Sequence, residues 1–122
     1  MNLNRIQIIG NLTADPSFGE SVNGSRYATL TVATNHRWRT RDGKQNDEPE
    51  FHHIQAWDSL AEAIQQTGVV KGDLVMIEGR NRTRSYTDKD GREMTTTEIV
   101  AHTFANLFTK TQALKRRHAT TY

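Results

Sequence analysis

Apolar and polar side chains alternate over residues 26–38, which is the pattern of a β-strand with one buried face. One face carries Ala28, Leu30 and Val32, and the other carries Tyr27, Thr29 and Thr31. The pattern therefore predicts a strand whose Ala-Leu-Val face packs into a core.

Four further strands are predicted at residues 3–9, 51–57, 74–84 and 92–104, where β-branched and other apolar residues gather. Turn signals separate the strands, namely Asp15-Pro16, Asn23-Gly24 and Asp88-Lys89-Asp90-Gly91. Residues 39–50 contain no large apolar side chain, so they predict a mobile loop with an Asp-Gly turn at its centre.

One short helix is predicted after the third strand. Ser59 and Glu62 have the spacing of a capping box, and Gly68 is a stop signal. Leu60, Ala63 and Ile64 form its apolar stripe. Three strands, a short helix and two strands are the order of an all-β OB-fold, a five-stranded barrel with the helix between strands 3 and 4. Other small β-domains share this inventory, so the order alone does not decide the fold.

The length of 122 residues suits one domain. Because the chain has no cysteine, disulfides and every Cys-based zinc site are excluded. No apolar run approaches the roughly 20 residues that span a bilayer, and the first residues lack the apolar core of a signal peptide. We therefore expect a cytoplasmic protein.

The charge distribution favours a nucleic-acid partner more than the net charge does. Lys and Arg total 16 against 14 Asp and Glu, for a net charge of +2. Most of the cations are Arg, whose planar guanidinium matches phosphate and stacks on bases. Arg37, Arg39 and Arg41 surround Trp38, and Arg80, Arg82 and Arg84 lead into Tyr86. A single such run is typical of a solvated strand face, but two runs beside aromatic rings favour nucleic-acid binding.

Short strings along the chain carry a resemblance to a known family. They are Ile9-Gly10-Asn11-Leu12 with Asp15-Pro16, Leu30-Thr31-Val32-Ala33-Thr34 before Trp38-Arg39, Phe51-His52 and Trp57, Lys71-Gly72-Asp73, Ile77-Glu78-Gly79, Arg82-Thr83-Arg84-Ser85-Tyr86-Thr87-Asp88 and Thr97-Glu98-Ile99-Val100. Their order and spacing resemble the bacterial single-stranded DNA-binding proteins over residues 4–104. The resemblance implies an OB-fold that binds single-stranded DNA without sequence specificity, needs no cofactor, and protects the strand during replication, recombination and repair.

The resemblance also implies which side chains bind DNA. It assigns base stacking to four aromatic residues, Trp38, Phe51, Trp57 and Tyr86. It assigns contacts with phosphates or bases to six cations, Arg37, Arg39, Arg41, Lys44, Arg82 and Arg84. The best-known pattern has Trp in place of Phe51 and Tyr86, and Phe in place of Trp57. Each replacement keeps a π-face, so we expect stacking to survive.

Each ring also has a structural interpretation. Trp57, ahead of the helix, could equally be a core residue. Trp38 lies between two arginines. Burial of the Trp38 ring would draw these charged neighbours towards the core at high cost, so we expect the ring to be exposed. Tyr86, just before a turn, is also expected to be exposed. The remaining rings are assigned to packing or to no role, namely Tyr27, Phe18, Phe104 and Phe108.

His52 and His53 lie near Glu48 and Glu50, but we expect no metal site, because adjacent strand residues point to opposite faces. The resemblance instead implies that His52 lies at a subunit interface of a homotetramer, with a dimer as the alternative.

Catalysis has little support, because the chain has neither a Gly-x-Ser-x-Gly turn nor a P-loop. We expect no enzyme activity. The alternative function is an OB-fold adaptor of replication restart that mainly bridges proteins.

We expect the OB-fold domain to span residues 1–105. Residues 106–122 form a short basic segment, expected to be flexible, whose end has no acidic tip and so gives no support to tail-mediated recruitment of replication and repair proteins.

Overall fold

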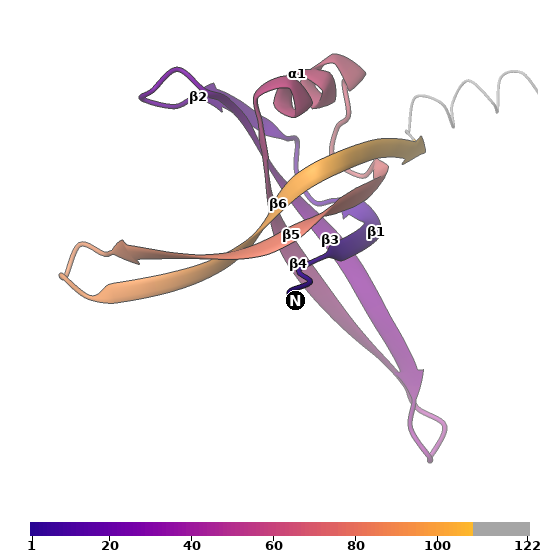
Figure 1. The fold of residues 1–122 in the computed structure, drawn as a ribbon. Coiled ribbons are helices and arrows are strands. Elements are labelled where there is room, and N and C mark those ends of the chain that lie inside the picture. Colours follow the sequence, from indigo (N-terminus) through magenta and orange to yellow (C-terminus); the bar gives the residue numbers. More distant parts are fainter. Residues whose placement is uncertain (109–122) are drawn as a thin grey trace, which may run out of the picture.

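The computed structural model describes residues 1–108 and shows a β-barrel with one helix over one end (Figure 1). In chain order, the elements are β1 (Ile6–Leu12), β2 (Ser17–Glu20), β3 (Arg26–Arg39), β4 (Gln45–Trp57), α1 (Asp58–Thr67), β5 (Leu74–Thr87) and β6 (Glu93–Phe108). The last strand continues past the predicted domain boundary at residue 105, and the rest of the predicted basic segment lies outside the described residues.

Five of the strands close into a barrel in the order β1-β5-β6-β4-β3, and β3 returns to β1 through the pairs Asn11–Ala33 and Leu12–Val32. The β4–β6 pairing is parallel, and the other pairings are antiparallel. The short β2, which was not predicted, extends the sheet beside the first half of β3. This closed mixed barrel, with its helix between the third and fourth barrel strands, confirms the predicted OB-fold.

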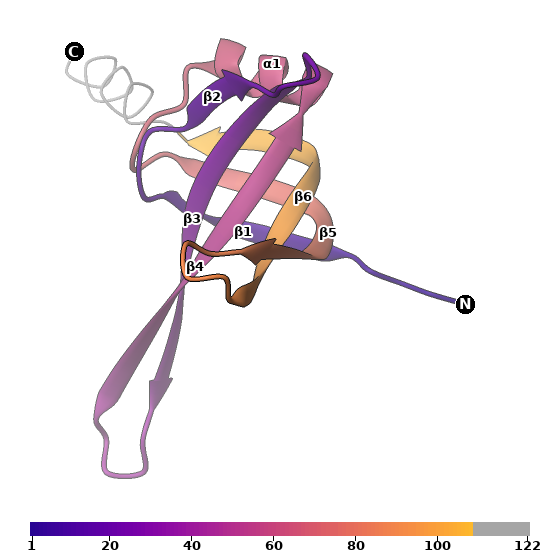
Figure 2. The ribbon, with the colours of Figure 1, turned by 90° about the vertical axis from the view of Figure 1, so that its left-hand side faces the viewer.

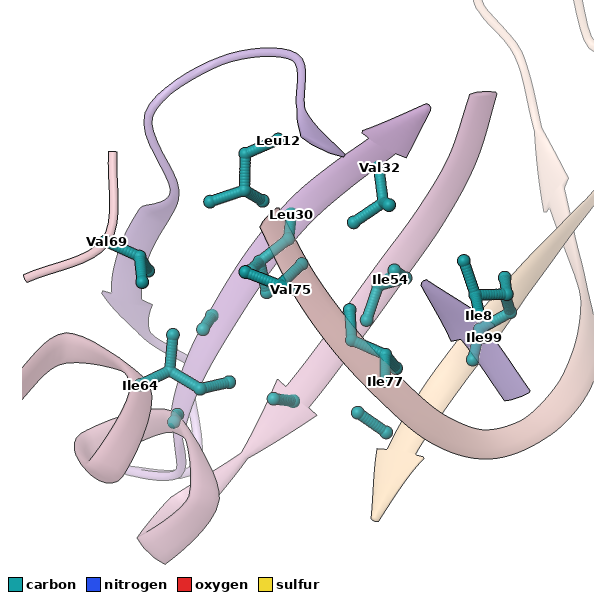
Figure 3. Close-up of a cluster of buried hydrophobic side chains, with 14 residues drawn as sticks. Ile8, Leu12, Leu30, Val32, Ile54, Ile64, Val69, Val75, Ile77 and Ile99 are labelled. Atoms are coloured by element: carbon teal, nitrogen blue, oxygen red, sulfur yellow. The ribbon is translucent and has the colours of Figure 1, made fainter. Parts of the chain in front are cut away.

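The core lies inside the barrel, where side chains from all five barrel strands meet (Figure 3). The predicted alternation along β3 is confirmed, because Ala28, Leu30 and Val32 are buried. The helix closes one end of this core with Ile64 and with Ala61. Ala63 is exposed, so the predicted apolar stripe was wrong at that residue.

The start of the helix differs from the prediction. Asp58 has a positive φ of 53°, and Trp57 at the N-cap makes no side-chain capping hydrogen bond. The predicted capping box of Ser59 and Glu62 is therefore wrong, and Glu62 instead pairs with Arg26 of β3 at 3.2 Å. Gly68 ends the helix in the left-handed conformation, as predicted.

Two hairpins project from the barrel in different directions, β3–β4 towards the lower right and β5–β6 towards the left of Figure 1. The prediction of a mobile loop over residues 39–50 was wrong, because β3 runs to Arg39 and β4 begins at Gln45. Only a short turn separates them, closed by a 2.9 Å hydrogen bond from the Thr40 amide to the Lys44 carbonyl. Figure 2 shows this long hairpin reaching away from the helix-capped end.

Among the described residues, no helix is long and apolar enough to cross a membrane.

Candidate nucleic-acid interface

The register of the β3–β4 hairpin determines which candidate side chains share a face. Residues directly opposite each other lie on the same face, and faces alternate along each strand. Phe51 pairs with Ala33, and Trp38 pairs with Asn46. Because Ile54 and Ala56 point into the barrel, odd-numbered residues of β4 point outward.

We call the outward side of β3, β4, β5 and β6 the outer face. On the β3–β4 hairpin, it carries Arg37, Arg39, Phe51 and Trp57. Phe51 is 59% exposed, and Ala33 opposite it is too small to cover the ring. Its face is therefore open for a base.

Trp38 lies on the opposite face of the same hairpin. It is 40% exposed, and the imidazole of His36 stacks on it with ring centroids 5.4 Å apart and planes inclined by 26°. The strand opposite contributes Glu48 and Glu50 to this face, Glu48 directly across from His36. Trp38 is therefore exposed, as predicted, but one side of its ring is occupied and its surroundings are acidic.

Trp57 lies outside the barrel, so the interpretation of this ring as a core residue does not hold. It pairs across the strands with Tyr27, and the two rings are tilted by 57° with centroids 5.9 Å apart. Both side chains are half-buried. Tyr27 does pack, as predicted, but against a candidate stacking ring. The alternation along residues 26–38 could have predicted this, because it places Tyr27 on the face opposite to Ala28 and Leu30, outside the barrel.

The outer face continues onto β5, where Arg80, Arg82, Arg84 and Tyr86 alternate with residues of the other face. Tyr86 is 48% exposed, and its cross-strand partner is Met94. Arg84 is also exposed. These side chains come from the second hairpin, so the structure brings candidate residues from both hairpins to one side of the sheet.

Arg82 is held in place by a buried carboxylate. Its Nε donates a hydrogen bond of 3.1 Å to Oε1 of Glu98, and its Nη2 donates to the same oxygen. Glu98 is only 5% exposed, whereas most acidic residues in proteins lie at the surface. Sequence reasoning gave Glu98 no role, although it belongs to the Thr97-Glu98-Ile99-Val100 string.

The cations at the end of the β3–β4 hairpin are balanced by acids. Arg37 pairs with Asp47 at 3.3 Å, and both side chains are more than half exposed, so the ion pair is weak and exchangeable. Arg39, Arg41 and Lys44 are exposed and form no ion pair within residues 1–108. The acids of the hairpin are Asp42, Asp47, Glu48 and Glu50. Sequence reasoning did not weigh them against the arginines.

The turn that carries Arg41 and Lys44 is ordered by side-chain hydrogen bonding. The Thr40 hydroxyl donates to the carboxylate of Asp42, and this hydrogen bond is the main cause that lowers the pKa of Asp42 below its ordinary value. A charged Asp42 therefore remains beside Arg41.

The two adjacent histidines point to opposite faces. His52 forms a 2.9 Å hydrogen bond with Thr34 on the inward side, and His53 lies 3.4 Å from the Thr31 hydroxyl on the outer face. Within the described part of the chain, no group of three His, Cys, Asp or Glu side chains is placed to hold a metal ion.

Comparisons with known proteins agree with this geometry. The model of the single-strand binding protein family matches residues 3–107. Single-stranded DNA-binding protein 1 of Xylella fastidiosa is 38% identical over 101 residues, which cover 82% of this chain and 74% of that protein. The single-stranded DNA-binding protein of Neisseria meningitidis serogroup A is 39% identical over 102 residues, 84% of this chain and 58% of that protein. The chain thus spans a little over half the length of the Neisseria relative.

Two solved structures share the fold. The single-stranded DNA-binding protein from Thermus aquaticus superposes with a TM-score of 0.75 at 26% identity, covering 88% of this chain and 52% of that one. The Plasmodium falciparum SSB in complex with single-stranded DNA superposes with a TM-score of 0.76 at 25% identity, covering 88% and 96%. With the family model matching nearly all of the described residues, this chain belongs to the single-strand binding protein family.

Proposed function

We propose that this chain binds single-stranded DNA without sequence specificity and protects it during replication, recombination and repair. The observation that carries the proposal is the outer face, where exposed rings and arginines from two hairpins lie on one side of the barrel. Membership of the single-strand binding protein family supports it.

Binding would combine stacking with phosphate contacts. Unpaired bases can stack on Phe51, Trp57 and Tyr86 whatever their identity, since every base has a π-face. Arginines along the strands would replace condensed counterions on the backbone, so affinity should fall with salt. Duplex DNA would bind poorly, because its bases already stack on each other.

The arginines would act in two ways. Arg37 can exchange its exposed partner Asp47 for a phosphate at little cost. Arg82 keeps its buried partner Glu98 and would offer only its remaining N–H donors. Its guanidinium is therefore already oriented before DNA arrives.

The proposed activity is binding and not catalysis, and it would act at the DNA of the nucleoid in the cytoplasm. The adaptor function is less favoured, because bridging proteins does not require Phe51 and Tyr86 to be exposed beside arginines. Stacking does not inspect the 2′-hydroxyl, so RNA should be included as a competitor in binding assays.

A homotetramer, with a dimer as the alternative, is also proposed. Within residues 1–108, one edge of β1 is unpaired from Ile6 to Gly10, and Ile9 is 56% exposed. An unpaired edge beside an apolar side chain suits a second copy of the chain. The proposed place of His52 at an interface is tested by light scattering of His52→Lys. A lower mass is expected, and an unchanged mass would contradict that role.

The function is tested by titrating intrinsic tryptophan fluorescence with oligo-dT at two salt concentrations, alongside a duplex of equal length. Quenching by the single strand alone, weakened by salt, is the expected result, because Trp57 and Trp38 lie on the hairpin that would meet the bases. If oligo-dT neither quenches nor competes with a labelled single strand, the adaptor function would replace the proposal.

A further inference from the structure

A small cavity opens at the fork between the two hairpins. The β4–β6 pairing includes Ile54–Ile99, and the residues that precede this pair part into hairpins pointing in different directions (Figures 1 and 2). The cavity has a volume of ≈ 100 Å³. Its lining includes Phe51, His52 and His53 from β4, and Asn81, Thr97 and Glu98 from the β5–β6 hairpin.

Glu98, which lines this cavity, has a carboxylate oxygen that is free to accept a hydrogen bond. Both hydrogen bonds from Arg82 go to Oε1. Oε2 accepts no hydrogen bond from the described residues and is not sealed from solvent. A buried carboxylate is stabilised when its remaining lone pairs meet donors. The free oxygen is therefore suited to a ligand that presents N–H groups.

The rim of the cavity suits a planar ring. Phe51 lines the cavity and is largely exposed, so a base stacked on its ring would lie beside the fork. The side chains of Asn81 and Thr97 make no hydrogen bond within residues 1–108 and can bond to ring nitrogens or carbonyls. The cavity therefore combines a stacking surface with polar groups that can contact a base edge.

We propose that this fork is a nucleobase subsite that favours cytosine over thymine. The 4-amino group of cytosine donates to a carboxylate, a pairing also found in base recognition by Glu and Asp. Thymine carries a carbonyl oxygen at the same position, which the Glu98 carboxylate repels. The subsite rests on the proposed binding of single-stranded DNA and adds a modest preference at one position of an otherwise unspecific track.

The test compares affinities for oligo-dC and oligo-dT of equal length, in wild type and in Glu98→Gln. We expect the dC-to-dT affinity ratio to fall about fivefold in the variant, the low end of what one base contact discriminates. The side-chain amide that this substitution introduces can donate to the thymine carbonyl, which shifts the ratio in the same direction. Glu93→Gln is the matched control, because it makes the same substitution on the same strand at an exposed position outside the cavity lining.

The ratio separates the subsite from general effects. If Glu98→Gln acts only by removing the charged partner of Arg82, it should weaken binding to oligo-dC and oligo-dT equally. The dC-to-dT affinity ratio would then stay unchanged, and this result would overturn the proposal. If Glu98→Gln does not fold, oligomers of 2-pyrimidinone nucleoside, which lack only the 4-amino group, test the wild-type protein. They should bind about fivefold more weakly than oligo-dC, and equal binding would overturn the subsite. If neither oligo-dC nor oligo-dT binds the wild type, the function itself fails.

Discussion

Trp38 and Phe51 lie on opposite faces of one hairpin, although both rings are exposed. The register places Phe51 with Arg37 and Arg39 on the outer face, and Trp38 with Glu48 on the other. A strand running along the outer face can meet Phe51 directly, but it must pass an edge of the hairpin to reach Trp38. In the proposed binding mode, the two rings would therefore act as separate contacts.

Their independence can be measured with a double-mutant cycle on oligo-dT affinity. Trp38→Ala and Phe51→Ala should each weaken binding, and OB-fold proteins of this family generally lose about 1–3 kcal/mol per stacking ring, a general value that does not come from this structure. Because the rings share no contact, we expect the two losses to add within about 0.5 kcal/mol. A coupling well above that would show that one stretch of bases touches both rings.

The acidic side of the hairpin should oppose binding. Glu48 shares a face with Trp38 and lies across from His36, where a passing phosphate would be repelled. Glu48→Gln should therefore raise affinity for single-stranded DNA at low salt, and the gain should shrink as salt screens the charge. Glu20→Gln on β2 removes the same charge at the other end of β3 and should change affinity less. Equal gains from both variants would indicate only a net-charge effect.

Alternation identified the barrel strands because burial leaves a period-two pattern, as at Ala28, Leu30 and Val32. The same method missed residues 45–50, which form the outer part of β4. These residues carry no large apolar side chain and are held against β3 by cross-strand backbone hydrogen bonds, which leave no apolar signature. The predicted loop was therefore a hairpin.

Which side chains of β3 and β4 lie opposite each other could not be predicted for a related reason. The pairing depends on the turn between Thr40 and Lys44, and a slip of one residue would move every side chain of one strand to the other face. The capping box failed because the helix begins at Asp58 with Trp57 as its N-cap, so Ser59 lies inside the helix and cannot cap it. Candidate residue types were readable from the chain, but their grouping required the register.

Arg82 and Arg84 should differ in their effect on stability. Arg82→Ala leaves the Glu98 carboxylate buried without its partner. The free energy of unfolding should therefore fall by about 1–3 kcal/mol or more. Arg84 is exposed and forms no ion pair within residues 1–108, so Arg84→Ala should stay within about 0.5 kcal/mol of wild type. Urea unfolding measures both. Equal stability of the two variants would mean that the Arg82–Glu98 pair contributes no net stabilisation.

Closure of the barrel depends on the close approach of β1 to β3 at Gly10. A Cβ on Gly10 would overlap the backbone carbonyl oxygen of Ala33, which cannot rotate away as a side chain could. Gly10→Ala must therefore push the strands apart beside the closing Asn11–Ala33 pair, and overpacking of this kind destabilises by about 1–3 kcal/mol. Thermal unfolding should show a drop of several degrees.

Gly43→Asn is the control for Gly10→Ala. Gly43 has a φ of 84°, and a Cβ added there would have no atom within 4 Å. Because Asn tolerates the left-handed conformation, the melting temperature of Gly43→Asn should stay near that of wild type. If Gly10→Ala also melted like wild type, β1 could shift without loss, and the β1–β3 contact would not hold the barrel closed. Since the outer-face rings lie on β4 and β5, and not on β1, the folded fraction of Gly10→Ala should still bind oligo-dT with wild-type affinity.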